Sequence, residues 1–335
     1  MNRSVYYIIG LIFFALVSCG GSNEIPEVVG TERNLDSLLL ISPNDIPLLV
    51  ERGNKLFKEY EYDLAMNDAA KAFRLDSNNF DTRLLYAEVL NNREKRTVED
   101  VQIAQNHYKW LVAKDAKNTR VLVGLAATYN FQQDFDNTFK YVNKALRIDP
   151  KYRDAYVLKG TTYRLIGNMK LAKSSYETAI QQDPTFFEAY FFLGQLYQAE
   201  NNEVCIEYFA TALDLRPDIL EVKYQLAYSK QLFGKIESAK DLYREMAADT
   251  VDFYVSRGLF HQGYIKQFVD KDIDSAMYFY KSTLETEPRT VEAWHNLGLC
   301  HAEKGDKERA LKSFSNALKY DPEFEMSRKE AERLR

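Results

Sequence analysis

A motif about 34 residues long recurs from Ile46 to Phe324, and this repeat constrains the fold more than any other feature of the sequence. A period of this length is typical of architectures in which each unit packs only against its neighbours. The predicted units are 46–79, 80–118, 119–152, 153–186, 187–219, 220–256, 257–290 and 291–324, and they begin at Ile46, Phe80, Thr119, Arg153, Phe187, Leu220, Arg257 and Val291. We therefore expect one elongated domain with no separate globular part.

Small and aromatic residues occupy fixed places within the units. The clearest copies carry Tyr156, Gly160, Tyr163, Ala172, Tyr176, Ala179 and Pro184 in one unit, and Trp294, Gly298, His301, Ala310, Phe314, Ala317 and Pro322 in another. Apolar residues three and four apart predict two amphipathic helices per unit. Gly160 would let the two helices approach closely, and Tyr163 and Tyr176 would fill the space beside it. Trp294 is expected to be a large buried side chain. A recurrent acidic residue followed by proline, as at Asp183 and Pro184, is expected to end the second helix in four of the units.

These landmarks resemble the tetratricopeptide repeat family. The resemblance implies an all-α fold, a right-handed superhelical solenoid of about eight helix-turn-helix units. Residues 325–335 would then form a C-terminal solvating helix. In this family the first helix of each unit lines a concave face that binds a protein or peptide partner. Carried over to this chain, that face holds the candidate groove residues Phe131, Phe191, Gln195, Tyr224, Tyr228, His261, Phe268 and His295.

The central stretch of this candidate groove is aromatic and weakly charged. Such a surface favours an apolar peptide segment or a partner helix. The alternative is that some of these side chains turn inward against the next repeat, because exposed aromatic patches are uncommon unless they are used. The lysines and asparagines of the family's dicarboxylate clamp are absent, with Asn54 as a half-match, so a cytosolic cochaperone is disfavoured.

The N-terminal residues predict a lipoprotein signal over 1–18. A short positive start is followed by an apolar run from Val5 to Val17, which is shorter than the about 20 residues that a membrane span needs. The tetrapeptide that ends at Cys19 (Leu-Val-Ser-Cys) resembles the lipobox of bacterial lipoproteins, so Cys19 is the expected lipidation site. Residues 19–45 would then form a tether and a short cap. Gly20 follows the cysteine where an aspartate would favour inner-membrane retention, so we expect a Gram-negative outer-membrane anchor, facing the periplasm or the surface.

Charge and motif searches exclude several functional classes. The chain carries a formal net charge of −5, which argues against nucleic acid as a partner. No phosphate loop, nucleophile elbow or paired-cysteine zinc pattern is present, so we expect neither enzymatic activity nor a cofactor. Cys205 and Cys300 are expected to be buried free thiols. His261 and His295 lie 34 residues apart, but two imidazoles without a further ligand make a poor metal site.

The sequence therefore predicts a non-enzymatic, lipid-anchored scaffold that holds a protein or peptide partner for cell-envelope assembly or secretion. Two alternatives remain open. One is a receptor for a small solute or glycan, whose rings could stack on the aromatic side chains. The other is a structural envelope protein that assembles with itself, so oligomerisation is possible.

Overall fold

Helical hairpins follow one another along the whole described chain, which in this computed structural model comprises residues 34–93 and 95–335. The predicted signal, Cys19 and most of the tether lie outside these residues. The described part contains eighteen helices and no strand: α1 Leu35–Ile41, α2 Ile46–Lys58, α3 Tyr62–Leu75, α4 Phe80–Asn92, α5 Val98–Lys114, α6 Thr119–Phe131, α7 Phe135–Ile148, α8 Arg153–Leu165, α9 Met169–Gln182, α10 Phe187–Ala199, α11 Cys205–Leu215, α12 Leu220–Leu232, α13 Ile236–Ala247, α14 Asp252–Phe268, α15 Ile273–Thr286, α16 Val291–Glu303, α17 Lys307–Tyr320 and α18 Glu325–Leu334. None of these helices is long and apolar enough to cross a membrane.

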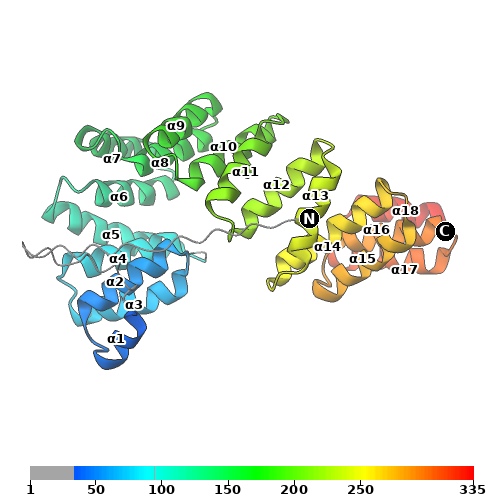
Figure 1. Ribbon diagram of the computed structural model, residues 1–335, viewed down its shortest axis with the longest axis horizontal. Helices are drawn as coiled ribbons and strands as arrows, with labels where there is room; N and C mark the ends of the chain where they lie inside the picture. Colours follow the sequence, from blue (N-terminus) through cyan, green and yellow to red (C-terminus); the bar gives the residue numbers. More distant parts are fainter. Residues whose placement is uncertain (1–33, 94) are drawn as a thin grey trace, which may run out of the picture.

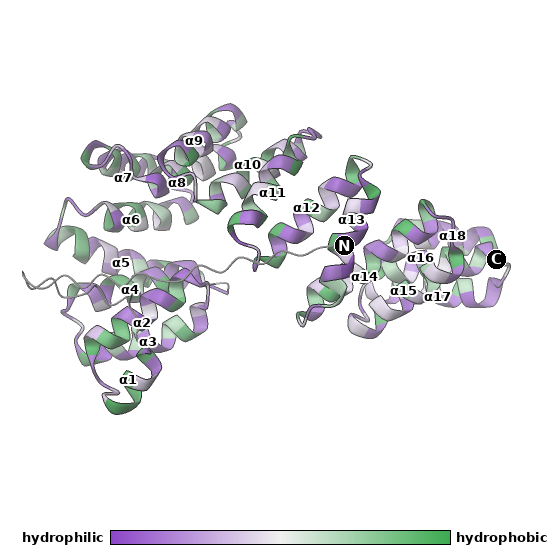
Figure 2. Cartoon of the chain, in the orientation of Figure 1, coloured by the Kyte–Doolittle hydropathy of each residue, from purple (hydrophilic) through white to green (hydrophobic). Residues whose placement is uncertain are grey.

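The helices pack in sequence order, each against the next, which makes the fold an all-α solenoid of helix-turn-helix pairs. The first helices of neighbouring pairs, such as α2 and α4 or α14 and α16, also touch each other. Figure 1 shows the pairs succeeding one another in an arc from α1 to α18. Figure 2 shows hydrophobic and hydrophilic residues alternating around each helix, as expected where one stripe is buried.

Glycines set the distance between the two helices of several pairs. A Cβ atom on Gly160 would lie 2.6 Å from the Tyr176 ring, and one on Gly298 would lie 2.5 Å from the Phe314 ring. Both rings are fully buried. The close approach that the sequence predicted at these small residues is therefore filled by an aromatic side chain of the second helix.

A second recurrent feature joins each unit to the proline that precedes it. The Tyr156 hydroxyl donates to the Pro150 carbonyl over 2.9 Å, and the Trp294 indole Nε1–H donates to the Pro288 carbonyl over 2.9 Å. The expectation that Trp294 is fully buried was wrong. Its ring is only half-buried because the indole N–H must reach a carbonyl at the solvent-facing turn.

The seventh unit departs from the predicted register at Arg257. Helix α14 begins at Asp252, five residues earlier, and the residue facing the Tyr280 ring is Gly263 rather than the residue seven positions after Arg257. Helix α14 also packs closely on α13, because a Cβ on Gly258 would lie 2.6 Å from the Tyr243 carbonyl oxygen. This close contact requires glycine at position 258. The presence of Gly258 as well as Gly263 obscured which glycine holds the recurrent place of the repeat unit.

The first superhelical turn closes on itself at the α2–α3 turn. Tyr60 has a positive φ of 65° and points its ring to the start of α10, where its hydroxyl donates to Glu188 Oε1 over 2.5 Å. The Phe187 ring lies 6.1 Å away, and the Arg216 guanidinium stacks 5.0 Å from the ring centroid. Units far apart in sequence therefore enclose a cavity of about 740 Å³, which we call the N-terminal lumen.

Candidate functional site

A second cavity of about 630 Å³ lies on the first helices of the last units, between α12, α14, α16 and the start of α18. We call it the C-terminal cavity. Its lining residues are Tyr228, Gln231, Leu232, Ile236, Phe260, His261, Tyr264, Phe268, Val269, Glu292, His295, Asn296, Leu299, Phe324 and Met326. The volume falls in the range of protein ligand pockets, and most of the lining is apolar or aromatic.

Four of the candidate groove residues meet at this cavity: Tyr228, His261, Phe268 and His295. Tyr228 and Phe268 are 37% and 39% exposed, so their rings are available to a partner. Further apolar side chains extend the exposed surface, with Leu232 and Val269 each 47% exposed. Large exposed apolar patches on folded proteins are typical of interaction sites.

The two histidines line the cavity without projecting into solvent. His261 is 6% exposed, stacks parallel to Tyr243 at 4.6 Å, and has Nδ1 3.0 Å from the Gln231 side-chain oxygen. Burial, assisted by the positive charge of Arg257, lowers the pKa of His261 to about 3. The imidazole is therefore neutral at physiological pH. It is packed and hydrogen-bonded, and it forms part of the cavity wall.

His295 is held in a similar way by α18. Its Nδ1 lies 2.9 Å from the Ser327 hydroxyl, and burial lowers its pKa below the ordinary value. The two histidines do not occupy equivalent frame positions, because His261 lies two residues before Gly263 and His295 three residues before Gly298. Within residues 34–93 and 95–335 no group of three or more metal-binding side chains gathers.

The other four candidate groove residues lie away from the C-terminal cavity. Tyr224 lies next to His261, which lines the cavity, and the Tyr224 hydroxyl is 3.4 Å from His261 Nε2. Phe191 turns partly inward, between Phe192 and Phe209 at centroid distances of 5.9 Å each. Gln195 is half-buried on α10, and Phe131 is exposed on α6 with the Arg96 guanidinium 5.0 Å from its ring centroid.

Several lining residues were not among the candidates from the sequence. Phe324 is the last residue of the last repeat and Met326 follows it, so neither holds a position that the repeat frame marks. Phe260 and Tyr264 belong to α14, where the additional turn disguised the frame. The available signal was the number of aromatic residues in α14 itself.

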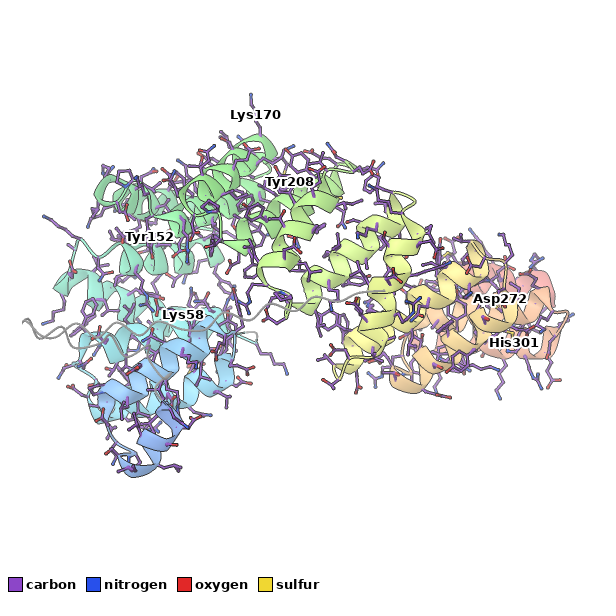
Figure 3. All side chains as sticks on the ribbon, viewed as in Figure 1. Lys58, Tyr152, Lys170, Tyr208, Asp272 and His301 are labelled. Carbon is purple, nitrogen blue, oxygen red and sulfur yellow. The ribbon has the colours of Figure 1, made fainter. Side chains whose placement is uncertain are left out.

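The N-terminal lumen has a different chemistry. Its lining carries the cationic side chains of Lys58, Arg120, Arg153 and Arg216 together with three carboxylates. Arg120 donates to both carboxylate oxygens of Glu88 over 2.5 Å, which compensates the burial of that acid. Figure 3 labels two lining residues, Lys58 at the end of α2 and Tyr152 before α8. The lumen is thus lined by many charged side chains, some of them paired, whereas the lining of the C-terminal cavity is mostly apolar.

Comparison with known protein families supports the repeat assignment. Models of the tetratricopeptide repeat match residues 154–186 and 291–324. The human tetratricopeptide repeat protein 6 is 26% identical over 198 residues, which cover 57% of this chain and 37% of that protein. Superkiller protein 3 of Schizosaccharomyces pombe is 24% identical over 325 residues, covering 93% of this chain and 21% of that protein. The mitochondrial import receptor subunit TOM70 of Rattus norvegicus is 23% identical over 187 residues, covering 52% and 30% respectively. The chain thus spans less than two fifths of the length of each of these relatives.

Solved structures share the fold. The Cut9–Hcn1 hetero-tetramer of the APC/C superposes with a TM-score of 0.61 at 16% identity, over 90% of this chain and 58% of the matched chain. Human IFIT1, solved as a dimer with m7Gppp-AAAA, superposes with a TM-score of 0.57 at 17% identity, over 85% and 76% respectively. Both likenesses concern the solenoid fold alone.

Proposed function

We propose that this tetratricopeptide repeat protein is a non-enzymatic scaffold that holds an apolar segment of a partner protein in its C-terminal cavity. The observation that carries the proposal is the exposed apolar surface around that cavity. Large side chains such as Tyr228, Phe268 and Met326 remain exposed to solvent although buried positions are available throughout the solenoid. Covering them with a partner would remove apolar area from water, the main source of free energy in protein association.

The form of the cavity suits a peptide segment or a helix laid along the first helices. Its lining residues come from α12, α14, α16 and α18, so an occupant would contact several units at once. Aromatic side chains in such a position are the usual binding hot spots. The names of two similar proteins, an import receptor subunit and an APC/C hetero-tetramer, refer to multi-protein assemblies, which accords with a scaffold role.

Nucleic acid is a poor alternative as the partner. Human IFIT1 has been solved with m7Gppp-AAAA, but this chain has a net charge of −5 and its C-terminal cavity is lined by no cationic side chain. Nucleic-acid binding depends on clustered lysine and arginine side chains. The basic side chains of the N-terminal lumen face acidic partners instead, as Arg120 faces Glu88.

For location, we propose a lipid anchor at Cys19 on a Gram-negative outer membrane, with a role in envelope assembly or secretion. The support is the sequence: an apolar run too short to span a bilayer precedes the lipobox-like residues that end at Cys19. In that setting a two-chain lipid anchor would keep the scaffold at the membrane while its cavity recruits the partner.

The experiment that tests the scaffold role replaces Tyr228 by a photo-crosslinking amino acid in living cells and identifies the captured protein. Tyr228→Glu should then weaken capture of that protein by about 2 kcal/mol or more, because a charge cannot enter the apolar contact. Tyr278→Glu is the matched control, since Tyr278 is 66% exposed on α15 and lies outside the cavity lining. Equal capture by the wild type and a folded Tyr228→Glu variant would exclude the cavity as the binding site.

A further inference from the structure

We propose that the C-terminal cavity selects a partner segment carrying a cationic side chain, held between the aromatic rings and the Glu292 carboxylate. This inference rests on the proposed function and adds the chemical class of the segment that is bound. It follows from the distribution of aromatic and charged groups in the cavity lining.

Aromatic rings dominate the lining. Tyr228, Phe260, Tyr264, Phe268 and Phe324 all line the same cavity, and they come from α12, from α14 and from the turn before α18. The rings of Tyr264 and Phe268 lie 4.7 Å apart on one wall. The faces of such rings carry negative electrostatic potential, so they attract an ammonium or guanidinium group and repel a carboxylate.

Glu292 is the one formally charged side chain among the residues that line the cavity. Both histidines of the lining are neutral, because burial lowers the pKa of each. The formal charge of the lining is therefore negative, from the Glu292 carboxylate, with no lining lysine or arginine to compensate it.

The Glu292 carboxylate is also available. In two other units the acid in the first turn of the first helix has a partner: Glu188 accepts from Tyr60, and Glu221 accepts from the Gln225 amide over 2.7 Å. Across the described chain Glu292 has no hydrogen-bond or ion-pair partner. A cation from a partner would pair with the Glu292 carboxylate while its alkyl stem lies along the aromatic walls.

Basic groups near the cavity do not supply that cation. Arg257 stacks with its guanidinium 5.0 Å from the Phe253 ring centroid and 5.9 Å from that of Tyr224, outside the lining. Lys266 is paired with Asp270 at 3.0 Å. No lysine or arginine of the described chain lines the cavity, so we infer that the complementary charge comes from the partner.

The test uses three fluorescein-labelled heptapeptides, Leu-Ala-Leu-X-Leu-Ala-Leu, in which X is lysine, norleucine or glutamate. Binding to the purified full-length chain is measured by fluorescence anisotropy. We expect the lysine peptide to bind about five- to tenfold more tightly than the norleucine peptide, the scale of a partly desolvated cation–π contact with one ion pair. The glutamate peptide should bind most weakly.

Two variants on the same helix sharpen the test. Glu292→Gln should reduce the affinity for the lysine peptide to that for the norleucine peptide and leave the norleucine peptide unchanged. Glu303→Gln, at the exposed far end of α16, should alter neither. A lysine preference that survives Glu292→Gln, or equal binding of the lysine and glutamate peptides, would overturn the inference.

Failure of the inference differs from failure of the proposed function. Equal binding of all three peptides that is lost in Tyr228→Glu retains the apolar cavity as a docking site and rejects only its preference for a cation. Absence of binding, or binding that Tyr228→Glu leaves unchanged, rejects both.

Discussion

The Tyr60 hydroxyl donates a hydrogen bond of 2.5 Å to Oε1 of Glu188, although 128 residues of sequence separate the two. The same turn position in later units is held by residues such as Gly167, Gly234 and Gly305, all with positive φ. A tyrosine there adopts a left-handed conformation that costs an L-residue about 1–2 kcal/mol. The contact with α10 joins this turn to a distant unit and closes the N-terminal lumen.

Replacing Tyr60 by glycine should open the lumen. Tyr60→Gly relieves the left-handed backbone but removes the ring from Phe187 and the hydrogen bond from Glu188. We expect the distance between spin labels at Lys58 and Thr185, both in the lumen lining, to lengthen and broaden in pulsed electron resonance.

The matched control is Lys271→Gly. Lys271 has a φ of 60° at the equivalent turn between α14 and α15, so glycine there should raise the free energy of unfolding by about 1 kcal/mol. An unchanged label distance in Tyr60→Gly would show that the closure does not depend on this contact.

His261 should make stability depend on pH. Its pKa is about 3 in the folded chain and about 6.5 when unfolded, so between these values the unfolded state binds more protons. Stability from this residue is fully present above pH 6.5 and is lost as the pH falls, by at most about 1.4 kcal/mol per pH unit. Urea midpoints of the wild type should therefore fall more steeply from pH 7 to pH 4.5 than those of His261→Gln. Parallel curves for the two proteins would contradict the assignment of a buried, neutral imidazole.

Gly298→Ala should destabilise the C-terminal unit by about 1–3 kcal/mol, because the added Cβ would collide with the Phe314 ring at 2.5 Å. Hydrogen exchange should show lost protection in α16 and α17 while α2 to α5 keep theirs, since solenoid stability is a sum of neighbour terms. Combining it with Phe314→Leu should cost less than the sum of the two single changes. Strict additivity would mean that the ring is not what fills the glycine position.

Cys19→Ser should abolish lipidation, because the thiol is the group that would carry the diacylglycerol. Labelling cells with an alkyne analogue of palmitate and probing the purified chain measures this directly. Cys205→Ser is the control, since Cys205 is a buried free thiol on α11. A Cys19→Ser chain that still incorporates the label would refute the anchor.

The all-α solenoid could be predicted from sequence because its determinants are local. A small residue such as Gly160 and the aromatic Tyr176 that covers it lie within one unit, so every copy repeats the same signal. The ends of four second helices are likewise marked by an acidic residue and a proline, as at Asp183 and Pro184. Because the repeat is short and occurs many times, the pattern can be recognised without knowledge of long-range contacts.

The site depended on tertiary structure. Sequence reasoning brought Tyr228 and His295 to one concave face, but it could not show that Phe191 turns partly inward or that Phe324 completes the cavity wall. It also missed the contact from Tyr60 to Glu188. Small rotations between successive units accumulate along a solenoid, and their sum decides which distant residues meet. The sequence by itself therefore determined the repeating unit and its packing, whereas the curvature summed over many units decided where the cavities lie and which side chains line them.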